Sequence, residues 1–80
     1  MKLYFLSQND NNGYDTYVSA VVCAENETDA KSISPDGEPF IENNPFSAWA
    51  IKASAISCKE IGIANEEQKR GVVIASFKTW

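Results

Sequence analysis

The stretch that decides the fold is residues 8–17, Q-N-D-N-N-G-Y-D-T-Y. Asn12-Gly13 is a strong signal for a chain reversal, because a tight turn needs positive φ, which glycine adopts freely and asparagine tolerates. Two β-type runs flank it, residues 3–7 and residues 17–24, and the gap between them is too long for a two-residue turn. We therefore predict a hairpin with a long, polar, ordered loop.

The first strand of this hairpin, residues 2–7, is apolar on both sides. Side chains alternate across a strand, so Leu3 and Phe5 share one face while Tyr4 and Leu6 share the other. A strand with two apolar faces is typical of the centre of a sheet rather than its edge. We therefore expect this strand to be central.

A short helix is predicted after the second strand, over residues 25–33. Asn26 can cap the helix, and Asp29, three residues later, completes a shortened capping box. Pro35 ends the helix, because the residue before a proline avoids α-helical geometry. The helix is therefore two to three turns long at most.

Residues 34–44 predict a surface loop, since proline and glycine in a Pro-Asp-Gly run favour a reversal. We expect Phe40 and Ile41 to fold back onto the body of the protein. Asn44-Pro45 is typical of a helix start. We therefore predict a short helix after it, with these apolar residues on one face: Phe46, Trp49, Ala50 and Ala53.

The rest of the chain predicts two more strands, residues 53–62 and residues 71–78, joined by a turn that Asn65 caps and Gly71 ends. The fold class is α+β: a single domain over residues 1–80, with a small antiparallel four-stranded sheet in the order β-β-α-β-β and one helix packed on one face. The apolar strand positions that we expect to be mostly buried are Leu3, Phe5, Val21, Ile56, Val73 and Phe77.

Net charge, hydrophobicity and cysteine content limit the partners and the cellular compartment that we expect. The charge of −4 repels phosphate backbones and anionic lipids, so neither a nucleic acid nor a membrane is expected as a partner. No apolar run is long enough for a membrane span or a signal peptide, which leads us to expect a cytoplasmic protein. Cys23 and Cys58 are then expected to be reduced and buried, with a disulfide between neighbouring strands as the alternative.

Catalytic and metal-binding patterns do not emerge, so we expect neither an enzyme nor a cofactor. The chain has no histidine, the usual general acid–base residue near neutral pH. A calcium-loop alignment on Gly13 places Asp10 and Asn12 in register, but it puts Gln8 and Ser19 where the two outer ligands belong. Both ends of that alignment fail.

Three stretches together resemble a group of small uncharacterised proteins encoded by bacteriophages and prophages. They are N-D-N-N-G-Y-D-T-Y-V-S-A-V-V-C-A-E-N-E-T-D-A, then E-I-G-I-A, then G-V-V-I-A-S-F. The likeness covers residues 1–30 and, less closely, residues 56–77, while residues 34–55 diverge. The resemblance implies expression in a bacterial host cytoplasm, and it carries over no catalytic residue and no mechanism.

Two functions from different classes fit these observations. The first is a non-catalytic phage accessory protein that binds a host or phage protein, with inhibition of a host protein or defence system as one such role. Its contact residues would lie in the first loop, where tyrosines offer large area with a polar tip and acids orient a basic partner: Asp10, Asn12, Tyr14, Asp15 and Tyr17. The alternative is a small assembly component that forms homo-oligomers, through residues 71–78 if that strand lies at the sheet edge.

Overall fold

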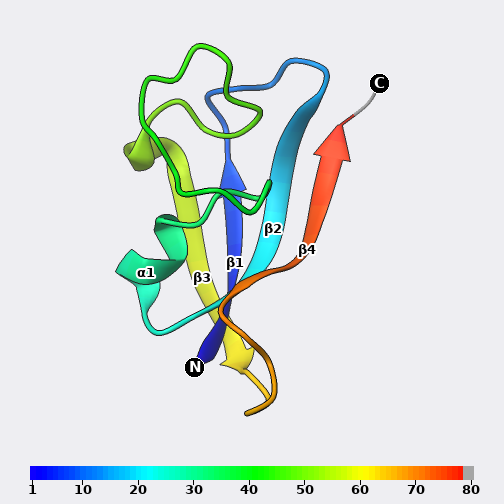
Figure 1. The fold of residues 1–80 in the computed structure, drawn as a ribbon. Helices are drawn as coiled ribbons and strands as arrows, with labels where there is room; N and C mark the ends of the chain where they lie inside the picture. The colour runs from blue at the N-terminus through cyan, green and yellow to red at the C-terminus, as the bar shows by residue number, and fades with distance from the viewer. Residues whose placement is uncertain (79–80) are drawn as a thin grey trace.

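Four antiparallel strands form one sheet in the computed structural model, which describes residues 1–78 (Figure 1). In chain order the elements are β1 (Lys2–Gln8), β2 (Thr16–Ala24), α1 (Glu27–Lys31), a short 3₁₀ turn (Ala53–Ala55), β3 (Ile56–Ile63) and β4 (Gly71–Lys78). The strands lie in the order β3-β1-β2-β4, so β1 is central and β4 is at an edge. The α+β class predicted from the sequence is confirmed, as is the central position of the first strand.

The core lies on one face of this sheet only. The helix α1 and residues 32–55, which we call the covering segment, lie on the same side of the sheet (Figure 1). From the covering segment, Trp49 and Ala50 enter the core and are almost completely buried. They pack with other buried residues, from the strands, from α1 and from the start of the covering segment: Tyr4, Leu6, Ala20, Val22, Ala24, Ala30, Ile33 and Ile56.

The prediction of which strand residues are mostly buried was only partly correct. Of the six named residues only Ile56 is buried, while Leu3 and Val21 are half-buried. The other three are exposed over 40% to 44% of their surface: Phe5, Val73 and Phe77. The reason is that both faces of β1 are apolar, so side-chain alternation does not say which face the rest of the chain covers. The covering segment packs on the face opposite to Leu3, Phe5 and Val21. Phe77 lies on the same face as Ala75, which packs against the core, and it is exposed because it stands near the end of the edge strand β4.

The β1–β2 loop is closed by a side chain and not by the Asn12-Gly13 turn. The carbonyl oxygen of the Gln8 side chain accepts hydrogen bonds from the amides of Asp10 and Asn11, at 3.0 and 2.9 Å. The positive φ in this loop is at Asp15, 62°, and neither Asn12 nor Gly13 adopts one. The hairpin was therefore predicted correctly, while its turn position was wrong.

The cap of α1 has the predicted form. The side-chain oxygen of Asn26 accepts a hydrogen bond from the Asp29 amide at 2.8 Å, and the Asp29 carboxylate accepts one from the Glu25 amide at 3.0 Å. The helix has only five residues, shorter than predicted. Within residues 1–78, no helix combines the length and apolar character needed to cross a membrane.

The second predicted helix was wrong. Asn44 does act as a cap, because its side chain accepts a hydrogen bond from the Phe46 amide at 3.0 Å, but only a turn follows. Residues 53–55 form the 3₁₀ turn, so β3 begins at Ile56 rather than at residue 53. Phe40 packs against the core as expected, whereas Ile41 is 64% exposed and does not.

Both cysteines are free thiols, as expected. Cys23 is buried, with its Sγ 3.9 Å from the Gln68 carbonyl oxygen, and Cys58 is half-buried in β3. The disulfide alternative is therefore not realised.

Candidate functional site

Two loops meet at one end of the sheet, the end where β1 stops and β3 starts (Figure 1). We call residues 9–15 together with residues 41–55 the loop platform. Asn11 joins the two loops, because its side-chain amide donates to the carbonyl oxygens of Ser47 and Trp49, at 3.0 and 2.8 Å. Since Trp49 is buried in the core, this bridge fastens both loops to the body of the protein.

The carboxylate of Asp10 makes a second bridge. Its two oxygens accept hydrogen bonds from the amides of Ile51 and Lys52, at 3.0 and 2.9 Å. Glu42 adds a third contact by accepting from the Ala53 amide at 2.7 Å. Asp10 was predicted as a partner-binding residue, and in the structure its carboxylate is engaged in holding the loops together.

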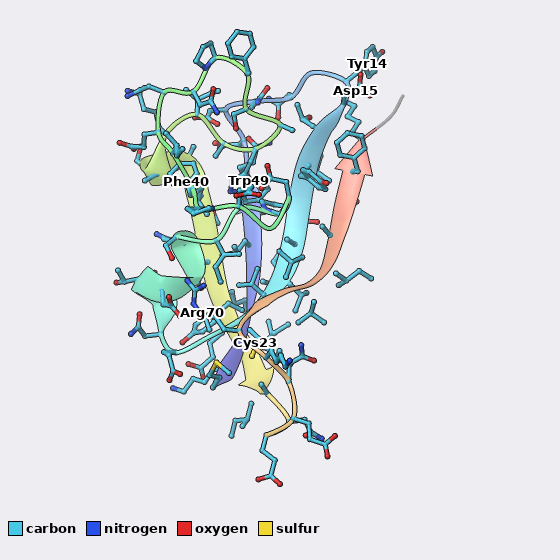
Figure 2. All side chains as sticks on the ribbon, viewed as in Figure 1. Tyr14, Asp15, Cys23, Phe40, Trp49 and Arg70 are labelled. Atoms are coloured by element: carbon cyan, nitrogen blue, oxygen red, sulfur yellow. The ribbon has the colours of Figure 1, made fainter. Side chains whose placement is uncertain are left out.

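Three other predicted residues lie together where β2 begins. Figure 2 shows Tyr14 and Asp15 at this corner, beside the end of β4. Tyr14 is 64% exposed, and the Lys78 ammonium lies 5.5 Å from the centroid of its ring, within cation–π range. The same ammonium donates to the Asn12 carbonyl oxygen at 3.4 Å, and the Asp15 amide donates to the Lys78 carbonyl oxygen at 2.6 Å. Lys78 was not predicted, because it is distant in sequence.

Tyr17, the fifth predicted residue, packs against the hydrophobic core. It is half-buried, and its ring meets Phe77 edge-on, with centroids 4.7 Å apart and an interplanar angle of 64°. Its amide donates to the Ala48 carbonyl oxygen at 2.7 Å. The geometry therefore brings Asn12, Tyr14 and Asp15 to the surface and turns Tyr17 toward the core.

Sequence reasoning missed the most exposed apolar residue of the platform. Phe46 is 92% exposed, and Ile41 is 64% exposed. Both line a hollow of about 330 Å³ together with Phe40. A large apolar residue directly after Asn44-Pro45 could have been interpreted as a turn residue, but it was assigned to a helix face.

The shifted pKa values in the described part of the chain have structural causes away from the platform. The Arg70 guanidinium, 2.7 Å from the Asp29 carboxylate, lowers the pKa of that carboxyl, with a further contribution from the Glu25 amide. Burial raises the pKa of the Cys58 thiol. Residues 1–78 contain no group of three or more acidic, cysteine or histidine side chains that could hold a metal ion.

Comparison with protein-family models, curated proteins and solved structures found no match to this chain. The resemblance to phage-encoded proteins gains no support from these comparisons and stays a prediction from the residues.

Proposed function

We propose that this chain is a non-catalytic binding protein that holds a protein partner on its loop platform, with Phe46 and Tyr14 as anchors. The observation that carries the proposal is the 92% exposure of Phe46 on a segment whose backbone is tied to the rest of the fold. An exposed phenylalanine stabilises nothing in the free protein. In a complex, aromatic anchors contribute much of the binding energy.

The hydrogen bonds of Asp10 and Asn11 support this proposal because they order the platform before any partner arrives. Ordering a loop on binding costs free energy, so a loop that is already held binds more tightly for the same contacts. Interface loops on a rigid sheet are a common arrangement in binding proteins.

The charge of the covering segment favours a basic partner. Among its acidic residues, Asp36 and Glu38 line the same hollow as Phe46, and Lys52 is its only basic residue. Charges at the rim of an interface steer a partner of opposite sign and set the association rate. The proposal extends to a phage or prophage accessory role in a bacterial cytoplasm, as the resemblance carried by residues 13–17 leads us to expect.

Affinity capture from a bacterial lysate tests the proposal with a matched control. Phe46→Ala and Tyr14→Ala should each reduce capture of the specific partner at least about 10-fold, the loss typical of an interface anchor. Ile63→Ala is the control. Ile63 is the last residue of β3, is 82% exposed, and pairs with Lys2 at the end of the sheet opposite the platform. Equal capture by the wild type and Phe46→Ala would contradict the proposal, as would an equal loss in Ile63→Ala.

A further inference from the structure

The face of the sheet opposite the core carries two neighbouring rows of side chains that cross all four strands in register. Residues paired directly across strands point to the same face. One row, which we call the apolar row, consists of Lys59, Phe5, Val21 and Ile74. The next row toward the platform, which we call the serine row, consists of Ser57, Ser7, Ser19 and Ser76.

Phe5 and Ile74 form an interrupted ridge in the apolar row, with the half-buried Val21 between them, and the serine row forms a shallow trough beside it. Phe5 is 40% exposed and Ile74 is 66% exposed. These two residues line a hollow of about 370 Å³ that also reaches Ser19 and Ser76. A large ridge next to a row of small side chains is complementary in shape to another copy of itself.

The charge of this face also suits a second copy. The chain as a whole carries −4, so two copies repel each other at most surfaces. The two rows contain no acidic residue and one basic residue, Lys59, which lies on the edge strand β3 and can reach solvent. Two copies can therefore approach through this face without bringing their carboxylates together.

We propose that a second copy of this chain packs on the open face, with the apolar row of each copy over the serine row of the other. Rows on one strand face are about 6.7 Å apart, and packed sheets lie about 10 Å apart. A twofold axis that runs along the rows, midway between them, places each ridge over the opposite trough. Ile74 then faces Ser76 of the second copy, and Phe5 faces Ser7 of the second copy.

The size of the face sets the strength of this association. Four strands at about 4.8 Å and seven residues at about 3.3 Å make a flat footprint of about 440 Å² per copy, or about 900 Å² for the pair. This area is an upper limit, and it lies below the value of about 1,200 Å² at which stable specific interfaces begin, so the association is weak and transient. We therefore expect a weak dimer, and the test covers a Kd of about 10–100 μM. The proposal uses a different surface from the loop platform, so either can fail alone.

Sedimentation velocity tests the dimer over a range of about 1 μM to 1 mM, which spans the expected Kd. The wild type should change from monomer to dimer across this range. Ile74→Asp should weaken dimerisation at least about 10-fold, because it places a carboxylate against the opposite trough. Phe46→Asp is the matched control on the platform and should dimerise like the wild type. A wild type that stays monomeric throughout would overturn the proposal, leaving the face to a different protein.

Pairs of engineered cysteines test the register without a destabilising substitution. With a bifunctional maleimide that spans about 10 Å, a mixture of Ile74→Cys and Ser76→Cys chains should form mixed cross-linked dimers in excess over either chain alone, since position 74 faces position 76 across a sheet spacing too wide for a direct disulfide. The wild type, which has Cys23 and Cys58, gives the background. Cross-linking of Ile74→Cys chains to one another in excess of the mixed product would overturn the face geometry and place the second copy along the edge of β4.

Discussion

Replacing neighbouring residues of β1 tests which face of the sheet holds the core. Leu6 is completely buried, whereas Phe5, the next residue, is 40% exposed. Sequence patterns treat the two faces alike, but the structure predicts very different losses for Leu6→Ala and Phe5→Ala. The comparison is informative because both substitutions lie at the centre of the same strand.

The magnitudes follow from burial. Leu6→Ala leaves a cavity in a packed core and should cost about 4 kcal/mol of unfolding free energy. Since 40% of Phe5 is exposed, about 60% of its ring surface is covered, which is about 90 Å² or about 2 kcal/mol at 25 cal/mol per Å². No cavity adds to this loss, because the face is open. A domain of 80 residues has a total unfolding free energy of about 4–12 kcal/mol. Both losses are large fractions of this total and can be measured.

Urea denaturation followed by circular dichroism, at a protein concentration of about 1 μM so that monomer dominates, measures both values. The Leu6→Ala variant should lose about 2 kcal/mol more than Phe5→Ala, with the same dependence on urea. Equal losses, or a larger loss for Phe5→Ala, would refute the assignment of the core to the Leu6 face.

Three further predictions concern other contacts. The hydrogen bond from Arg70 lowers the pKa of Asp29, so this carboxylate stabilises the fold above the ordinary aspartate pKa, and the stabilisation is lost as pH falls through the lowered pKa. Asp29→Asn should therefore flatten the acid side of the curve of unfolding free energy against pH. An unchanged curve would contradict this. Asn11→Ala should cost about 1–2 kcal/mol in urea denaturation, since it leaves two platform carbonyls without their donor. Cys23 is buried and should react with a thiol reagent only when the protein unfolds. Cys58 should react slowly in the native state, because burial raises the pKa of its thiol. Rapid labelling of Cys23 in the native state would be the contrary result.

Local patterns predicted those elements whose causes are local. Residues 71–78 were assigned to a strand with the bounds that β4 has, because the β-branched Val72, Val73 and Ile74 favour a strand, although the partner strand β2 is distant in sequence. The cap at Asn26 was also found, since both of its hydrogen bonds lie within four residues. Where one short stretch contains all the interacting groups, sequence spacing is sufficient.

The platform depends on contacts between distant residues, which spacing does not reveal. Asp10 bonds to amides more than forty positions away, and this contact holds residues 51–52 in a turn rather than a helix. The reversal expected at Asn12-Gly13 moved to Asp15 because Gln8 closes the loop from the other side. Sequence spacing also does not reveal that the Asp10 carboxylate accepts hydrogen bonds from Ile51 and Lys52, so Asp10 was predicted to bind a partner instead.

The two proposed surfaces are compatible in one assembly, and their arrangement has a consequence. The twofold axis of the proposed dimer reverses the strand direction between layers, so the two loop platforms point away from each other. A partner bound at one platform then does not cover the open face, and partner binding should leave the dimer intact. Dimer formation should also raise the unfolding free energy with concentration by mass action. Phe5→Ala should therefore become more costly relative to Leu6→Ala as protein concentration rises toward the Kd, because only Phe5 gains a contact from the second copy.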